Sequence, residues 1–421
     1  MRNHLLCIAL LTATLPLTAQ NSAPTQDTTP PAARPGVSQQ AAAPRRTPAP
    51  TYASPEVHPD GSVTFRTMAP NAKSVEVEIE GARTAMKPDD GCGMDNASTP
   101  TDCSAARTII PGLWIGTTKP FAPEVYEYRF RIDGAYYLDT KNHIIQNNLQ
   151  ELVNNFTIPN CLLVQTCPAP MPWEIQDIPH GEVVQHFYSS KVVLNLKANE
   201  DYYYVYTPPG YSAKGAAYPV LYLLHGFSDD ADGWLSAGYA NRIFDALIHE
   251  GKMKPAIVVM TLGYGNLDVV MKSGRTPGLS AQSLDLYQKS LLTEVIPQVE
   301  STYHVAKDRN HRAIAGLSMG GQESLIIGLN HTDMFAYVGT FSAGVNAGTI
   351  NQLPKLTAQQ ANLKLLWMAV GVDDALLTPN RTVIAALKAE GLPVTAIETP
   401  GHHQWPVWRD NLVHFAPLLF Q

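Results

Sequence analysis

Alternating apolar and polar positions mark the N-terminal part of this chain. Residues 61–66, 74–79 and 124–132 each place an apolar side chain at every second position, as half-buried strands do. An Asp-Gly pair at 133–134 is a hairpin turn that leads from the third of these runs into a further short strand. We therefore predict a small all-β sandwich in this part of the chain.

From residue 187 onward, short apolar runs alternate with segments of helical periodicity. The predicted strands are 191–196, 202–206, 219–224, 256–261, 335–341, 363–370 and 394–398. The predicted helices are 239–250, 283–303, 379–390 and 408–419. This alternation implies an α/β domain, with a mostly parallel sheet covered by helices on both faces.

Composition divides the chain further. A positively charged start, an apolar core at 5–17 and the small residue Ala19 are typical of a secretory signal peptide. The next segment is rich in Pro, Ala, Thr and Gln and cannot bury enough apolar surface to fold, so we expect a flexible linker. The predicted segments are a signal peptide (1–19), a disordered linker (20–50), the β-sandwich (51–160), a second linker (161–186) and the α/β domain (187–421). A secreted or periplasmic location follows.

Charge and cysteine use narrow the function classes. The formal net charge is −7 and there is no long basic run, which argues against a nucleic-acid partner. Only the N-terminal apolar run comes near the length of a membrane span, and it is too short. Cys7 lies in the predicted signal peptide. The other four cysteines lie in two close pairs, which suggests Cys92–Cys103 and Cys161–Cys167 disulfides in an oxidising compartment. A zinc site is the alternative, although no Cys-x-x-Cys spacing supports it.

The strongest chemical signal is the segment HRAIAGLSMGG at 311–321. A β-type run leads into Gly-Leu-Ser-Met-Gly, and helix-forming residues follow. This pattern indicates a strand, a sharp turn and a helix with Ser318 at the apex, where Gly316 and Gly320 avoid clashes in the tight turn. We interpret it as the nucleophile elbow of an α/β-hydrolase. A glycine-rich turn without chemistry is the alternative.

A serine nucleophile needs a base to accept its proton, and the base needs a carboxylate to orient it. In this fold the order along the chain is serine, acid, histidine, each on a loop at the carboxyl end of a strand. One apolar strand ends at Asp373 and Asp374, and a later strand leads to His402 and His403. Spacing alone does not decide between the two aspartates or between the two histidines.

The oxyanion that forms during ester hydrolysis needs two fixed hydrogen-bond donors. The N–H of Met319, directly after the serine, is the first candidate. The second is the N–H of Phe227, in a loop where Gly226 allows close approach of the backbone. The neighbouring His225 is expected to be structural.

Several motifs of the α/β domain resemble those of the esterase D group, which includes feruloyl and acetylxylan esterases of carbohydrate esterase family 1. They are YTPPGY at 206–211, YPVLYLLHG at 218–226, GLSMGGQES at 316–324, a GxxD at 371–374 and GHHQWPVWR at 401–409. The resemblance implies an α/β-hydrolase fold with Ser318 as nucleophile, Asp374 as acid and His403 as base. His402 occupies a position where such relatives often carry glycine, and it stays the alternative base.

The N-terminal part also resembles a known module. Its stretches PDGSVTFRTMAPNAKSVEVEI and YEYRFRIDG are similar to the immunoglobulin-like early-set domains found beside glycogen-branching enzymes and some secreted esterases. Relatives of that module sometimes bind glycans through exposed aromatic residues, and Trp114 and Tyr136 are the candidates here. Packing in the core or at an interface is the alternative role for both.

These observations predict a secreted serine carboxylesterase that needs no metal or organic cofactor. By resemblance, its substrates are hydroxycinnamoyl (feruloyl) or acetyl esters of plant polysaccharides. Trp234 and Trp405 either stack on an aromatic acid or fill the core. The alternatives are a siderophore esterase, an acyltransferase with the same nucleophile, and a glycan-binding protein whose hydrolase domain is catalytically silent.

Overall fold

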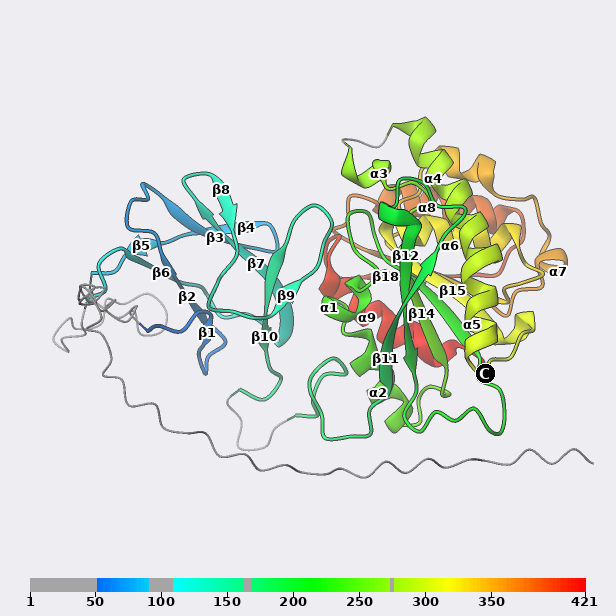
Figure 1. Cartoon of the computed structure of the whole chain (residues 1–421), viewed down its shortest axis with the longest axis horizontal. Helices are drawn as coiled ribbons and strands as arrows, with labels where there is room; N and C mark the ends of the chain where they lie inside the picture. Colours follow the sequence, from blue (N-terminus) through cyan, green and yellow to red (C-terminus); the bar gives the residue numbers. More distant parts are fainter. Residues whose placement is uncertain (1–50, 91–108, 163–167, 273–275) are drawn as a thin grey trace, which may run out of the picture. The chain divides into compact units, whose positions relative to one another are not determined.

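The computed structural model describes residues 51–90, 109–162, 168–272 and 276–421 (Figure 1). The predicted signal peptide and first linker lie outside these residues, as do Cys92, Cys103 and Cys167. Cys161 takes part in a disulfide. Because the other three cysteines of the predicted pairs lie outside the described residues, both pairings stay predictions. Within the described ranges, no helix combines the length and the apolar character needed to cross a membrane.

The N-terminal described part consists of two sheets (Figure 1). One sheet has the order β1 (Glu56–Val57), β2 (Val63–Met68), β6 (Leu113–Thr117) and β5 (Lys87–Pro88). The other has the order β4 (Ala82–Ala85), β3 (Val75–Ile79), β7 (Glu124–Ile132), β10 (Val153–Ile158) and β9 (Ile145–Gln146), with β8 (Ala135–Tyr137) paired to β7. All of these strand pairs are antiparallel.

Aromatic rings from both sheets form the core between them. Phe65 of β2 lies 4.8 Å from the ring of Tyr128 and 5.5 Å from the ring of Phe156, on β7 and β10 of the other sheet. Trp114 packs against this core, and its indole N–H donates to the carbonyl of Ala69 at 2.9 Å. The described strands of this part form antiparallel sheets, as the alternation predicts. The immunoglobulin-like type stays a prediction.

The second half of the chain is built on one eight-stranded sheet. Its order is β11 (Glu182–Ser189), β12 (Glu200–Thr207), β14 (Ile257–Thr261), β13 (Val220–Leu224), β15 (Arg312–Leu317), β16 (Tyr337–Phe341), β17 (Leu365–Gly371) and β18 (Val394–Thr399). The first two pairings are antiparallel, and all pairings from β14 to β18 are parallel. The central strands are buried throughout because both faces are covered, as the apolar runs predict.

Helices cover the sheet on two sides. They are α1 (Gly233–Ser236), α2 (Ala240–His249), α3 (Asp268–Met271), α4 (Pro277–Ser290), α5 (Ile296–Thr302), α6 (Ser318–Asn330), α7 (Ala358–Ala361), α8 (Leu377–Ala389) and α9 (Trp405–Phe415). Leu221 and Leu223 of β13 pack with α2 and α9, whereas Tyr222 and Leu224 of the same strand pack with α5, α6 and α8. The two faces of one strand thus supply two separate apolar cores.

One predicted strand is wrong. Residues 191–196 form a loop, and the edge strand is β11, which begins inside the segment predicted as the second linker. Side-chain hydrogen bonds favour the loop. The hydroxyl of Ser190 accepts the N–H of Val193 at 3.0 Å, and the carboxylate of Glu294 accepts the N–H of Lys191 at 2.8 Å. The apolar alternation of this segment therefore does not reflect strand pairing.

A buried arginine links the β-sheet region to the α/β region by hydrogen bonds. Residues Pro50–Gln421 form one compact unit. Arg409 of α9 is 1% exposed. Its guanidinium donates to the carbonyls of Val125 on β7 and of Ala237 after α1, at 2.5 and 2.6 Å, and forms an ion pair with Glu124 at 3.1 Å. Each nitrogen of this guanidinium thus contacts an acceptor, as a buried charge requires.

Candidate active site

The turn from β15 to α6 holds Ser318 in a left-handed backbone conformation. Its φ is +48°, which is rare for a residue with a side chain. The neighbouring glycines leave no room for a Cβ atom. One on Gly320 would lie 2.4 Å from the carbonyl oxygen of His225, and one on Gly316 would lie 2.6 Å from the backbone of Gly320. The predicted strand–turn–helix with the serine at its apex is therefore confirmed.

Three side chains that are distant in the sequence meet at this turn. The hydroxyl of Ser318 lies 3.0 Å from Nε2 of His403, and Nδ1 of the same ring lies 2.8 Å from Oδ2 of Asp374. His403 follows β18 and Asp374 follows β17, so both lie at the carboxyl edge of the parallel sheet. This is the arrangement in which an imidazole can accept the serine proton while a carboxylate orients it.

The structure separates the two pairs of candidates that spacing left open. Nδ1 of His402 lies 3.0 Å from the backbone carbonyl of Asp373, and both of these residues are exposed. The side chain of Asp374, in contrast, is fully buried and also accepts the N–H of Leu376 at 2.8 Å. Burial opposes ionisation of this carboxyl, but the hydrogen bonds from His403 and Leu376 outweigh it, and the pKa of Asp374 is lowered.

The loop after β13 lies beside the serine. A Cβ atom on Gly226 would lie 2.6 Å from Cδ1 of Leu317 and 3.4 Å from the Cβ of Ser318, so glycine allows this backbone to pack closely against the elbow. Phe227 follows on this loop, and Met319 occupies the first turn of α6, where N–H groups have no partner within the helix. The two residues predicted to supply the oxyanion donors thus lie on the two segments next to Ser318.

His225 holds this loop in place through two hydrogen bonds. Its Nδ1 lies 2.7 Å from the carbonyl oxygen of Gly226, and its Nε2 accepts the N–H of Gly263 at 2.9 Å. This pair of contacts requires a neutral ring with the proton on Nδ1. Burial lowers the pKa of His225 to about 4, which keeps the ring neutral. Its contacts match the structural role expected from the sequence.

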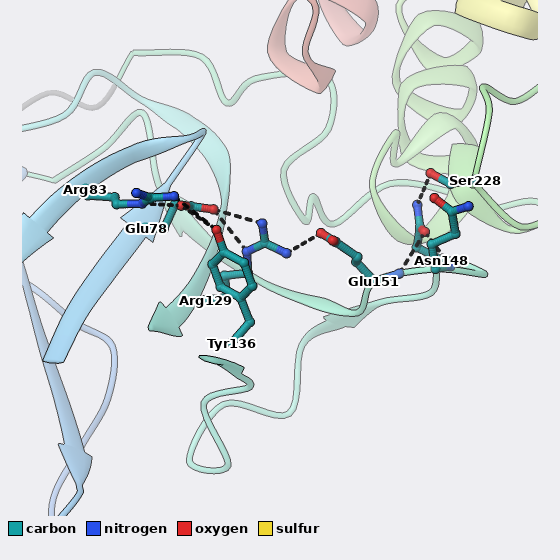
Figure 2. A network of polar contacts seen from close by, with 8 residues as sticks. Glu78, Arg83, Arg129, Tyr136, Asn148, Glu151 and Ser228 are labelled. Atoms are coloured by element: carbon teal, nitrogen blue, oxygen red, sulfur yellow. Dashed lines mark hydrogen bonds and ion pairs between the residues drawn. The ribbon is translucent and has the colours of Figure 1, made fainter. Parts of the chain in front are cut away.

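A segment from the β-sheet region reaches the same loop, as Figure 2 shows. The amide of Asn148 donates to the hydroxyl of Ser228 and to Oδ1 of Asp229, both at 3.1 Å. The other carboxylate oxygen of Asp229 accepts the N–H of Gly226 at 3.2 Å. Asn148 therefore contacts, through Asp229, the backbone at Gly226 that lies beside Ser318. No sequence motif pointed to it, because its partners lie about eighty positions away.

A chain of ion pairs anchors this segment to the sandwich (Figure 2). Oδ1 of Asn148 accepts the N–H of Glu151 at 3.1 Å, and the Glu151 carboxylate pairs with Arg129 of β7. Arg129 also pairs with Glu78 at 2.9 Å, and Glu78 accepts the hydroxyl of Tyr136 at 3.1 Å. Tyr136, a candidate glycan-binding ring, thus belongs to this network and lies under the Arg129 guanidinium.

We expect Asn148→Ala to lower kcat by about 10- to 100-fold with little change in KM, because a small displacement of the oxyanion loop weakens transition-state binding. The neighbouring Asn147 offers a matched control, since it makes a comparable hydrogen bond to Asp232 at 2.7 Å. Steady-state kinetics on a chromogenic ester would compare the two variants. Equal losses in Asn148→Ala and Asn147→Ala would show that this segment has no specific effect on the loop.

A cavity of about 1000 Å³ opens at Ser318. Trp405 and Trp408 line it on the α9 side, and the indole of Trp408 meets the His403 ring edge-to-face at 4.9 Å. Trp234 does not line this cavity. It is fully buried, its indole N–H donates to the carbonyl of Leu224 at 2.9 Å, and the structure therefore identifies it as a core residue and not as a substrate contact.

The parallel sheet, the serine elbow and the His–Asp pair at its carboxyl edge define the class of this protein as an α/β-hydrolase. The family model described as "Putative esterase" matches residues 199–419, more than half of the chain. The chain therefore belongs to this esterase family and is by family a carboxylic ester hydrolase.

Individual relatives agree with this membership. The chain is 32% identical over 322 residues to an endo-1,4-beta-xylanase/feruloyl esterase of Xylanibacter ruminicola, a match that covers 74% of this chain and 40% of that protein. The chain thus spans only two fifths of the length of that relative. The esterase resemblance that the motifs indicate is confirmed by the family model.

Two solved structures share the fold. The CE1 ferulic acid esterase AmCE1/Fae1A of Anaeromyces mucronatus has a TM-score of 0.53 and 23% identity, over 60% of this chain and 96% of that one. The enterobactin esterase FES of Shigella flexneri has a TM-score of 0.58 and 17% identity, over 85% of this chain and 92% of that one. At these identities the likeness establishes the fold alone.

Proposed function

We propose that this protein is a secreted serine esterase that hydrolyses hydroxycinnamoyl or acetyl esters of plant polysaccharides through an acyl-enzyme. The observation that carries the proposal is the contact of Ser318 with His403 at 3.0 Å, together with that of His403 with Asp374 at 2.8 Å. A hydroxyl on a strained turn, a base and a buried carboxylate are the parts that acyl transfer requires.

In the proposed mechanism, Ser318 attacks the ester carbonyl while His403 takes its proton. The N–H groups of Phe227 and Met319 stabilise the oxyanion of the tetrahedral intermediate. His403 then protonates the leaving alcohol, and the acyl group stays on the serine. Water attacks the acyl-enzyme with His403 again as base, and the free acid is released. Asp374 holds the tautomer of His403 and stabilises its charged form.

The proposed acyl group fits the apolar side of the cavity. The indoles of Trp405 and Trp408 lie next to His403, and flat aromatic acids pack well against such rings. The xylanase/feruloyl esterase relative supports the same choice. Trp405 is only 3% exposed, so its contribution is a small patch of the cavity wall.

Hydrolysis of a siderophore such as enterobactin is the second candidate. It is favoured by the fold likeness to an enterobactin esterase over 85% of this chain, a larger share than that matched by the ferulic acid esterase. The same three residues would serve as the catalytic set, and only the substrate would differ.

A substrate panel separates these candidates. Methyl ferulate, acetylated xylan and enterobactin would be assayed with the purified protein, with Ser318→Ala as the inactive control. We expect release of ferulate or acetate and none of the enterobactin product. Hydrolysis of enterobactin alone would establish the siderophore esterase, and transfer to an added alcohol in preference to water would establish an acyltransferase. Polysaccharide binding without hydrolysis of any ester would establish a silent binding protein.

A further inference from the structure

The β-sandwich supplies one wall of the cavity that contains Ser318. Glu80 of the β3–β4 turn, Glu127 of β7 and Gln146 of β9 all line it. The Glu80 carboxylate accepts the N–H of Glu127 at 2.9 Å, and Gln146 donates a side-chain hydrogen bond to the Glu127 carboxylate. These three residues, here called the polar wall, are therefore linked to one another by hydrogen bonds.

Two oxygens of the polar wall have no hydrogen-bond partner among the described residues. Gln146 is only 3% exposed, yet its side-chain oxygen accepts nothing, and Oε1 of Glu127 is buried and equally unsatisfied. Buried polar atoms are nearly always paired, because leaving them unpaired costs free energy. Unpaired acceptors that line a cavity therefore indicate a ligand with hydrogen-bond donors.

The charge of the polar wall restricts that ligand further. Burial, and then the carboxylates of Glu80 and Asp229, raise the pKa of Glu127, and burial likewise raises the pKa of Glu80. Both carboxyls are thus held toward their neutral forms, and a further negative charge at this buried position is unfavourable. Neutral hydroxyl groups can donate to both unpaired oxygens without adding charge.

The two sides of the cavity differ in a way that orients an ester. Trp405 and Trp408 form an apolar patch beside His403, which suits an aromatic acyl group. The polar wall lies on the sandwich side, and a volume of about 1000 Å³ leaves room for the alcohol portion as well. The donors that the polar wall requires are those of a polyhydroxylated alcohol.

From these observations we infer that Gln146 and Glu127 bind hydroxyl groups of a neutral sugar that forms the alcohol portion of the substrate. The β-sandwich then contributes directly to substrate selectivity. This inference rests on the proposed function, because the alcohol portion is defined by attack of Ser318 on the ester.

The test compares two esters of the same acid. For the wild type, we expect kcat/KM for feruloyl arabinofuranose to exceed that for methyl ferulate, because only the former has a sugar. In Gln146→Leu the ratio of these two values should fall by about five- to tenfold, the effect of one lost hydrogen bond. Gln176→Leu is the matched control, since its amide donates to the Met171 carbonyl at 3.2 Å, away from the cavity, and its ratio should match that of the wild type. Gln146→Ala carries the test if Gln146→Leu does not fold.

The possible outcomes are distinct. If the wild type hydrolyses both esters but the ratio is unchanged in the Gln146 variants, the sugar subsite is disproved while the proposed function stands. An equal loss on both esters would also disprove it, because it shows general damage. A ratio that depends on added Ca²⁺ would mean that the carboxylates hold a cation instead. If neither ester is hydrolysed, the proposed function fails and the subsite with it.

Discussion

Ser318→Ala and His403→Ala are each expected to lower kcat for ester hydrolysis by about 10⁶-fold, and the double variant by no more than either alone. The effects are not additive because the hydroxyl is a weak nucleophile without its base, and the base has no proton to accept without the hydroxyl. The 3.0 Å contact between these two side chains is the structural basis of the expectation. Burst and steady-state kinetics with a chromogenic ester would measure kcat for each variant.

His402→Ala is the matched control for the base. This ring is directly adjacent in sequence, but its Nδ1 contacts the backbone carbonyl of Asp373, and its loss should lower kcat by less than about tenfold. Circular dichroism would confirm that all variants are folded. Should His402→Ala be inactive while His403→Ala keeps its activity, the proposed base would be the wrong one of the pair.

Asp374→Asn is expected to lower kcat by about 10⁴-fold with little change in KM. Oδ2 of Asp374 accepts from Nδ1 of His403 at 2.8 Å, and its other oxygen accepts the N–H of Leu376. In the asparagine variant, an amide group facing the ring would favour the tautomer with its proton on Nε2, which cannot accept the serine proton. The lowered pKa of the native carboxyl means that it stays ionised at neutral and mildly acidic pH, so the loss should persist across that range.

The neighbouring Asp373 provides the comparison for the acid. Its carboxylate is exposed, and it is its backbone carbonyl that meets His402. We expect Asp373→Asn to keep activity within about threefold of the wild type, because a solvated carboxylate at the cavity rim contributes little. Rates of Asp373→Asn as low as those of Asp374→Asn would remove the basis for assigning Asp374 as the acid.

Local sequence patterns determined the elements of this fold well. The run 219–224 and strand β13 (Val220–Leu224) agree within one residue, and the segment 239–250 agrees equally well with α2 (Ala240–His249). The main error, at 191–196, arose because side-chain hydrogen bonds of Ser190 and Glu294 hold a loop there. Glu294 lies about a hundred residues away along the chain, so its contact leaves no trace in local periodicity.

The sequence by itself was enough to propose Ser318 as the nucleophile, since the strained turn there requires glycines at fixed neighbouring positions. It also placed the acid and the base within two residues each, because chain order and strand ends are local properties. Only the tertiary structure favours Asp374 and His403 over their neighbours as the proposed acid and base, since burial and hydrogen-bond distance depend on how separate loops meet. For the same reason, the sequence did not point to Asn148 or Gln146. Both lie at the cavity only because the β-sandwich packs beside it.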